Sequence, residues 1–205
     1  ASRHGRPPLA AIEDMPGGDP KVSMEGHDVT NRPRVWVLRG GKAGDNHQLL
    51  SLAEALDWPF QVVDVRYNAA FAIPNVLLRA SRMSVRGTAP PLAPPWPDLV
   101  LAAGQRSVPL ARWIKRQNAQ ARLVQVGRPR APLNWFDLIV TTPQYGLPPR
   151  ANILCNLLPL HGVSSERLHQ ARKAWAGTLS GYPSPRHAVF IGGPSWSHAL
   201  GPRDA

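Results

Sequence analysis

The feature that most limits the fold is a short apolar run that recurs along the chain and stops each time at a glycine or a polar loop. Helical or long connecting segments separate these runs. Strands that are apolar throughout occur in parallel sheets covered on both faces, whereas half-exposed strands alternate apolar and polar residues. The expected strands are residues 35–38, 60–65, 99–103, 122–126, 136–141 and 187–191, with a shorter run at 152–155 as a further candidate.

Helical spacing fills several of the gaps between these runs. The expected helices run from Asp45 to about Leu56, over residues 108–117, and from Ser164 or Ser165 to about Trp175. Gln48, three positions after Asp45, completes a capping box at the start of the first helix. The alternation predicts an α/β fold: a Rossmann-like domain over residues 33–180, with a parallel sheet and helices on both faces.

The two ends of the chain differ from this domain. Residues 1–32 are rich in Gly, Pro, Asp and His and have no apolar period, so we expect a disordered tail. Residues 181–205 begin with a linker that contains Gly and Pro and then open a new strand. Because a lone strand is not stable by itself, we expect this stretch to begin a second, truncated C-terminal domain.

Composition excludes several classes of protein. Hydrophobic residues make up 43% of the chain and charged residues 18%, which allows a sizeable core, while 23 prolines argue against a helical bundle. A single cysteine, Cys155, excludes a disulfide framework and a cysteine-based zinc site. The lack of a His-x-x-x-His pattern or a carboxylate cluster argues against a tightly bound metal. No apolar window reaches the ~18 residues of a membrane-spanning helix.

The charge balance points to an anionic partner. Lys and Arg number 24 against 13 Asp and Glu, a formal net charge of +11, which suits nucleic acid, anionic lipid or a phosphorylated ligand. Aromatic residues make up 7% of the chain and are not interleaved with the basic ones. Since no nucleic-acid-binding module is present either, we expect no nucleic-acid partner.

Polar loops follow four of the expected strands and carry the candidate binding site. The carboxyl ends of parallel strands share one edge, where open α/β folds bind ligands. Glycine lets the backbone approach a ligand, and helix N-termini present free N–H groups to an anion. The alternative is ordinary turn chemistry with solvated arginines. The candidate phosphate-binding residues are Gly41, Lys42, Gly44, Asp45, Asn46, Gly104, Gln105, Arg106, Ser107, Arg128, Thr142 and Gln144, and Arg130 adds charge at the same rim.

The first loop also holds the candidate catalytic group. His47 lies one or two residues inside the expected helix and is the candidate general base toward an acceptor hydroxyl, with a surface histidine as the alternative. Asp45, as the expected N-cap, would accept backbone N–H bonds that favour its charged form, which suits a base poorly. The loop matches neither the P-loop nor the dinucleotide-binding pattern. Ser195 lacks the Gly-x-Ser-x-Gly elbow, which disfavours a hydrolase triad.

Residues 71–86 combine apolar and basic side chains. A helix expected over 74–83 would place an apolar side next to Arg79, Arg82 and Arg86, which suits the surface of an anionic membrane. The alternative is a core-packing helix with a solvated basic end. The resulting expectation is a cytoplasmic protein with a peripheral contact on the inner face of a bacterial membrane, or at the mitochondrial surface in a eukaryote.

The order and spacing of several motifs carry a family resemblance. The motifs are the run at 35–38 followed by Gly-Lys-Ala-Gly-Asp-Asn-His-Gln at 41–48, Pro-Asp-Leu-Val at 97–100 with Ala-Gly-Gln-Arg-Ser at 103–107, and the segments 126–130, 136–145 and 192–195. Together they cover roughly residues 34–197 and resemble the mitochondrial-fission ELM family, whose bacterial members were long carried as a domain of unknown function.

The resemblance implies a GT-B-like architecture, in which two Rossmann-like domains face each other across a cleft, with this chain as the N-terminal half. The ELM family is similar to glycosyltransferases that act on lipid-linked precursors. The implied role is the acceptor side of a nucleotide-sugar-dependent transferase that acts on a phosphate-bearing or lipid-linked acceptor, without a tightly bound cofactor. By that analogy Gly193 and Ser195 begin the donor side, and this fragment alone would not catalyse.

Fold analogy alone does not fix a reaction. Two other functions therefore stay open at this point. One is a non-catalytic adaptor on a GT-B scaffold that serves membrane or organelle division. The other is a module that only holds a nucleotide.

Overall fold

A seven-stranded sheet forms the centre of the computed structural model, which describes residues 32–189. The strand order is β3-β2-β1-β4-β5-β6-β7, and every neighbouring pair is parallel except β2 with β3. The predicted α/β, Rossmann-like fold is therefore confirmed. The strands are β1 (Val35–Arg39), β2 (Phe60–Tyr67), β3 (Val85–Ala89), β4 (Leu99–Ala103), β5 (Arg122–Val126), β6 (Leu138–Thr141) and β7 (Ile153–Cys155).

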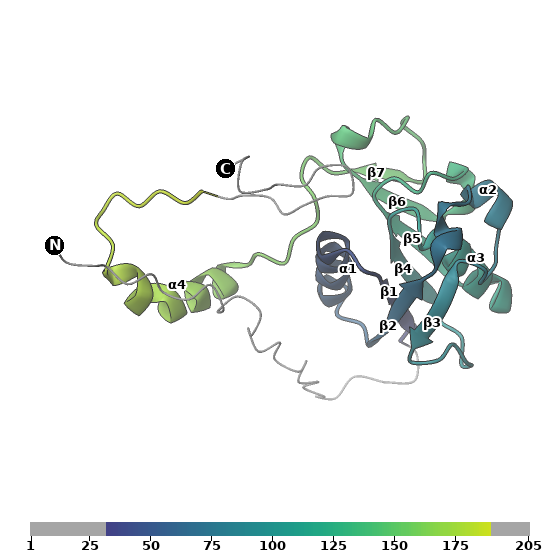
Figure 1. Ribbon diagram of the computed structural model, residues 1–205, viewed down its shortest axis with the longest axis horizontal. Coiled ribbons are helices and arrows are strands. Elements are labelled where there is room, and N and C mark those ends of the chain that lie inside the picture. The colour runs from purple at the N-terminus through teal and green to yellow at the C-terminus, as the bar shows by residue number, and fades with distance from the viewer. Residues whose placement is uncertain (1–31, 190–205) are drawn as a thin grey trace.

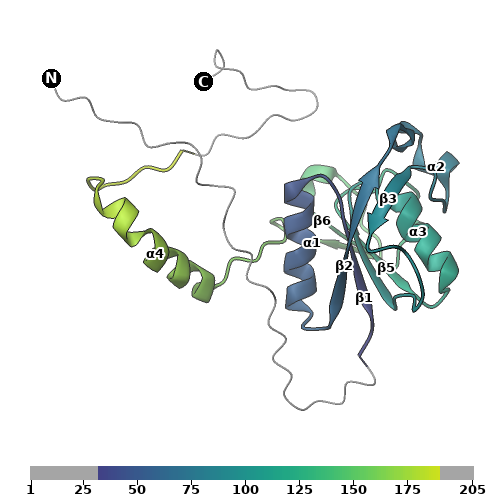
Figure 2. The ribbon, with the colours of Figure 1, turned by 60° about the horizontal axis from the view of Figure 1, so that its bottom comes forward.

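Helices pack on both faces of this sheet, as predicted. Figure 1 and Figure 2 show α1 on one face and α3 on the other, with α2 at the edge near β3 and α4 away from the sheet. The α-helices are α1 (Ala43–Ala55), α2 (Asn75–Leu78), α3 (Val108–Gln117) and α4 (Ser165–Ser180). Three short 3-10 helices, η2 (Ala69–Ala72), η3 (Leu133–Trp135) and η4 (Pro143–Tyr145), lie in the connections.

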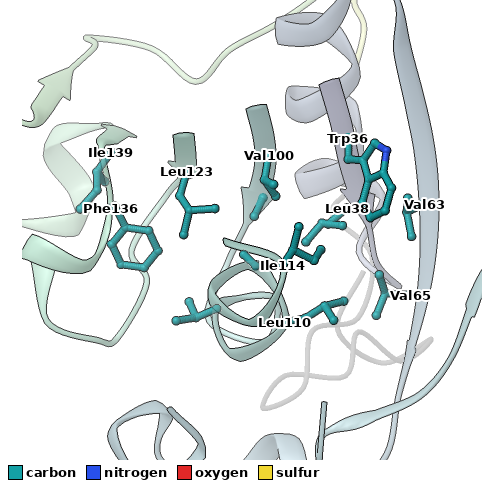
Figure 3. Packing of buried hydrophobic residues seen from close by; sticks show 13 residues of the cluster. Trp36, Leu38, Val63, Val65, Val100, Leu110, Ile114, Leu123, Phe136 and Ile139 are labelled. Carbon is teal, nitrogen blue, oxygen red and sulfur yellow. The ribbon is translucent and has the colours of Figure 1, made fainter. Parts of the chain in front are cut away.

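The larger core lies between the sheet and α3. Leu110 and Ile114 of α3 are fully buried and belong to one cluster with sheet residues such as Val65, Val100 and Leu123 (Figure 3). Trp36 is the buried tryptophan of this cluster and stacks at a tilt on Trp96. Truncating a buried Leu or Ile to Ala typically costs about 2–5 kcal/mol, so this layer is a main source of stability.

A second core lies on the α1 face. Val35 and Val37 of β1 pack there against Leu49 and Ala53 of α1, while the alternate residues of β1 face α3. Both sides of β1 are therefore buried over residues 35–38, which explains why these four positions are all apolar.

The region between β2 and β4 differs from the prediction. The helix predicted over 74–83 is wrong, because α2 ends at Leu78 and the next residue, Arg79, has a positive φ of 51° that does not continue a helix. The chain then forms β3, which pairs antiparallel with β2 at the sheet edge, so the sheet is not wholly parallel. The sequence Val-Arg-Gly-Thr-Ala of β3 has no continuous apolar run, since an edge strand is not buried on both faces.

Several element boundaries also differ from the prediction. The strand predicted to start at Phe136 begins at Leu138, and the helix predicted to end near Trp175 continues to Ser180. Ser164 is the N-cap of that helix, as predicted, because its hydroxyl accepts the Arg167 N–H at 3.1 Å. None of the helices within residues 32–189 is long and apolar enough to cross a membrane.

Two predictions fall on residues that the structure does not describe, 1–31 and 190–205. The disordered tail lies in the first of these stretches. The strand expected over 187–191 lies partly in the second, and its described residues, 187–189, form no strand. The tail and the truncated second domain therefore stay predictions.

Asp137 joins three elements at the start of β6. Its carboxylate accepts hydrogen bonds from Lys115 Nζ of α3 at 2.6 Å, from the Leu123 backbone N–H of β5 at 2.8 Å and from Arg122 Nη1 at 3.0 Å. Burial alone would raise the pKa of Asp137, but these bonds outweigh it and hold the pKa below its ordinary value. The carboxylate therefore contributes more to stability when it is charged.

We expect Asp137→Asn to lower the free energy of unfolding by about 2 kcal/mol at pH 7, because the lost bonds involve charged groups. A folded-state pKa below the unfolded value means that this stabilisation is complete above about pH 4 and is lost as the pH falls through the folded value. Urea unfolding followed from pH 7 to pH 3 should show the wild-type and variant curves converging. Glu166→Gln, a matched change on the exposed surface, should cost less than about 0.5 kcal/mol. A gap that persists at low pH would contradict the charge-based explanation.

Candidate functional site

A cavity of about 460 Å³ opens at the carboxyl edge of the sheet. It is bordered by the loops after β1, β4 and β5 and by η4. Its lining residues are Leu38, Gly40, Gly41, Lys42, Asp45, Asn46, Gln48, Leu49, Tyr67, Ala103, Gly104, Gln105, Arg106, Val126, Gly127, Arg128, Arg130, Gln144 and Tyr145.

The strand order explains why the cavity lies here. β1 pairs with β2 on one side and with β4 on the other, so the chain reverses its direction of travel across the sheet between these strands. The loop after β1 leads to α1 on one face, and the loop after β4 leads to α3 on the opposite face. Loops that separate in this way leave a crevice, which is the usual ligand site of open α/β folds.

Asn46 fixes the loop after β1. Its Oδ1 accepts the Gly40 N–H at 2.9 Å and its Nδ2 donates to the Gly40 carbonyl at 2.8 Å. With the loop held in this way, α1 begins at Ala43, and Lys42 stands at the N-cap position without a side-chain cap bond. The predicted capping box is therefore wrong, and Asp45 lies in the first turn of α1 with its side chain at the cavity.

Gly104 and Gln125 fix the loop after β4. Gly104 has φ of +66°, and a Cβ at this position would lie 3.1 Å from Asp45 Oδ2, so both the backbone and the space favour glycine. The buried Gln125 donates from Nε2 to the Gly104 carbonyl at 2.8 Å. Ser107 is buried behind this loop, where its hydroxyl donates to the Ala103 carbonyl at 2.8 Å.

Asn75 of α2 connects two of the cavity loops. This buried side chain donates from Nδ2 to the Gln105 carbonyl after β4 and to the Pro129 carbonyl after β5, both at 3.0 Å. The two bonds hold the loops that carry Arg106, Arg128 and Arg130 in a fixed relation. Sequence reasoning missed Asn75, because nothing in its local pattern indicates carbonyl partners 30 and 54 residues away.

The lining carries a strong excess of positive charge. Lys42, Arg106, Arg128 and Arg130 all border the cavity, and Asp45 is the carboxylate among its described lining residues. The Arg106 guanidinium lies over the Phe71 ring, with Cζ 3.9 Å from the ring centroid, so this charge is held by a cation–π contact. The uncapped N-terminus of α1 adds its partial positive charge at the same rim.

Two tyrosines that were not among the candidate residues predicted from the sequence also line the cavity. Tyr67 ends β2, and burial raises the pKa of its phenol far above the ordinary value, while the nearby Arg106 charge acts in the opposite direction. Tyr67 therefore stays protonated at neutral pH and keeps an O–H donor in the cavity. Tyr145 follows Gln144 in η4 and lies against Gly127, whose φ is +76°.

The structure brings together most, but not all, of the candidate residues. Nine line the main cavity, and they are Gly41, Lys42, Asp45, Asn46, Gly104, Gln105, Arg106, Arg128 and Gln144. Gly44 and His47 are exposed on α1 and do not line it, and neither does the buried Ser107. Gly193 and Ser195 lie outside the described residues.

Thr142 borders a smaller hollow that shares Gln144 and Tyr145 with the main cavity. Its buried hydroxyl has no hydrogen-bond partner in the described part of the chain. A buried hydroxyl without a partner is costly, and it lies next to the small hollow rather than in the main cavity.

The arrangement suits the binding of an anion. Over residues 32–189, no group of three or more His, Cys, Asp and Glu side chains is placed to hold a metal ion. Guanidinium groups and backbone N–H donors of a helix N-terminus are the usual partners of phosphate oxygens. Asp45 and the amides of Gln105 and Gln144 add groups that can hydrogen-bond hydroxyls.

Comparison with known proteins identifies a family and two relatives to which this chain is similar. A family model described as mitochondrial fission ELM1 matches residues 43–205. An uncharacterized protein of Rickettsia prowazekii is 30% identical over 111 residues, which cover 52% of this chain and 30% of that protein. The mitochondrial fission protein ELM1 of Arabidopsis thaliana is 26% identical over 123 residues, which cover 48% of this chain and 28% of that protein. The chain thus spans less than a third of the length of these curated relatives, and no solved structure matches it.

We expect Asn75→Ala to loosen the loops after β4 and β5 together, because it removes the donor that both carbonyls share. The free energy of unfolding should fall by about 2 kcal/mol, since one buried and one half-buried carbonyl lose their partner. Hydrogen–deuterium exchange should accelerate in both 104–107 and 128–131. The neighbouring Val76→Ala is the matched control, because Val76 is half exposed and should leave both segments unchanged. Faster exchange in only one loop would contradict a shared connection.

Proposed function

This chain belongs to the mitochondrial fission ELM1 family, and we propose that its cavity binds the phosphate or diphosphate of a substrate in glycosyl transfer. In this proposal the domain is the acceptor-side half of a GT-B-like glycosyltransferase. The acceptor carries a phosphate and is linked to a lipid, and a nucleotide sugar is the donor. The remainder of the longer protein supplies most of the donor site.

The observation that carries the proposal is the convergence of positive charge on one hollow at the reversal of strand order. Lys42, Arg106, Arg128 and Arg130 come from three different loops, so their common position depends on the fold and not on a local basic run. A diphosphate needs several donors at once, and fixed charges do not have to be reorganised when it binds. A single phosphate or diphosphate would occupy only part of about 460 Å³, which leaves space for a sugar.

The geometry favours Asp45 over His47 as the group that accepts a proton from the acceptor hydroxyl. Asp45 borders the cavity and is not the N-cap of α1, whereas His47 is exposed and lies outside the lining. A general base has to lie within hydrogen-bond reach of the proton it removes. In this reading the cations bind phosphate oxygens, and Asp45 and Gln105 orient the hydroxyl.

Membrane contact is the second part of the proposal. The residues after β2 include several exposed apolar side chains: Leu77 is 70% and Met83 is 65% exposed, and Ile73 and Val76 are also exposed. Arg79 and Arg86 are exposed in the same segment. Apolar side chains beside basic ones suit the interface of an anionic membrane. Asn75 attaches this segment to the rim of the cavity, so a lipid-linked acceptor would reach the cavity from the membrane.

The competing function is a non-catalytic adaptor in membrane division. It needs an interaction surface but no ligand in the cavity. The excess of cations in a concave site favours the ligand-binding function, because an unused cluster of like charges is destabilising. Ligand binding therefore separates the two functions directly.

We expect the chain to bind inorganic pyrophosphate and to lose about tenfold in affinity when Lys42 or Arg128 is changed to Ala. Each change removes a charge-assisted hydrogen bond worth about 1.5 kcal/mol. Isothermal titration calorimetry at low salt would measure the affinity for pyrophosphate. A thermal-shift series with UDP- and GDP-sugars would test nucleotide sugars in the same way.

Arg116→Ala is the matched control for this experiment, because Arg116 is an exposed residue in the last turn of α3 and does not line the cavity. It should bind pyrophosphate like the wild type. Equal binding by all three variants would show that the cavity is not the anion site. No binding by the wild type would favour the adaptor function.

We expect Leu77→Asp to weaken binding to phosphatidylcholine vesicles that contain phosphatidylglycerol by tenfold or more, because burying a leucine in the interface contributes about 2 kcal/mol. Arg79→Glu should weaken it by about fivefold or more and wild-type binding should fall with salt, since each basic residue near the surface contributes about 1 kcal/mol. Vesicle co-sedimentation measures both effects.

Leu157→Asp provides the matched control for the vesicle experiment. Leu157 is an exposed leucine beyond β7, outside the 71–86 segment. Binding that all variants retain equally, or binding to pure phosphatidylcholine alone, would overturn the proposed contact. The pyrophosphate experiment is independent, so failure of one part can be told from failure of the other.

A further inference from the structure

The face of the sheet that carries α1 is covered only in part. Beside α1, a groove of about 460 Å³ runs over β5, β6 and β7, and its walls are almost entirely apolar. Val124, Leu138, Val140 and Leu154 form its floor. The lining is completed by Pro33, Leu52, Leu56, Trp58, Asp98, Leu99, Leu101, Arg122, Asn156 and Leu160.

The topology explains why the groove is open. Connections between parallel strands are right-handed, so the connections from β4 through β7, which all travel in the same direction, have to cross the α3 face. Leu133 of the β5–β6 connection and Leu147 of the β6–β7 connection pack against the core on that face. No connection inside the described sheet can therefore cover the α1 face of β5–β7. Only chain before β1 or after β7 can do so.

The segment after β7 has the chemistry to fill the groove. Helix α4 carries Leu168, Ala171, Trp175 and Leu179 at spacings of three and four residues, which places them on one face of the helix. All residues of α4 are exposed, and Leu168 is 59% and Trp175 is 46% exposed. Glu166, Gln170 and Lys173 occupy the opposite face. A surface helix with such a stripe normally buries it against a core.

The chain also holds α4 next to the groove. Leu160, which lines the groove, precedes the N-cap of α4 by four residues. In the first turn of α4, Arg167 Nη2 contacts Glu54 Oε2 of α1 at 2.8 Å. The helix therefore starts beside the end of α1 that borders the groove, and the rest of it points away from the sheet (Figure 2).

We propose that α4 docks its Leu168–Ala171–Trp175–Leu179 face into the groove over β5–β7, turning about residues 161–164. The extended position of α4 and the docked position are then two arrangements of one hinge. Docking completes the α1 face of the domain and fixes where the chain that follows α4 continues. The proposal does not depend on what the cavity at the carboxyl edge binds.

Thiol accessibility in the groove tests the proposal. Cys155 is exposed, so the background is Cys155→Ser, and Leu154→Cys places a single thiol in the groove of the full 205-residue chain. We expect slow maleimide labelling of this thiol. The labelling rate should rise about tenfold or more when Leu168→Asp and Trp175→Asp are added, because a helix docked nine-tenths of the time leaves the thiol accessible for only about one-tenth of the time. The matched control, Gln170→Asp with Lys173→Asp, changes the polar face and should leave the rate unchanged.

Three results would overturn the proposal. The first is fast labelling in the parent chain, and the second is an equal increase in both double variants. The third is protection that disappears on dilution, which would assign the groove to a second copy of the chain. If Leu154→Cys does not give the native circular dichroism spectrum, Leu138→Cys provides a second thiol position on the floor of the same groove.

Discussion

The right-handed crossover of parallel strands is the constraint on which the rest of this structure depends. From β1 the chain moves first toward β2 and later, after β4, in the opposite direction. With one handedness, the two directions place their connections on opposite faces of the sheet. The same rule therefore produces the crevice at the carboxyl edge, the α3 core, and the open groove beside α1.

Hydrogen bonds from buried or half-buried amide side chains then give the crevice a defined shape. Asn46 holds Gly40, Gln125 holds Gly104, and Asn75 holds the carbonyls of Gln105 and Pro129. These bonds satisfy backbone groups that the loops would otherwise leave without partners. Because the loops are held by fixed amides, the cationic side chains they carry start from a rigid base. This is the preorganisation that an anion site needs.

The proposed functions of the molecule share one region. Asn75 belongs to α2, so the segment with exposed Leu77 and the cavity with its arginines are parts of one hydrogen-bonded unit. A lipid-linked phosphate has an apolar part and an anionic part, and this arrangement provides a surface for each. The groove proposed to receive the apolar face of α4 lies elsewhere, beside α1. In the longer proteins of this family, that docking would set where the chain after α4 continues.

The sequence by itself determined six of the seven described strands, α1, α3 and the class of fold, because apolar runs such as Val35–Val37 and helical spacing are local signals of burial. It also located most of the cavity, since loops after parallel strands always meet at one edge. Only the tertiary structure decided that β3 pairs antiparallel, that Asp45 faces the cavity while His47 does not, and that Tyr67 and Asn75 belong to the site. Those outcomes depend on contacts between residues far apart in the chain, and no local pattern of residues encodes such contacts.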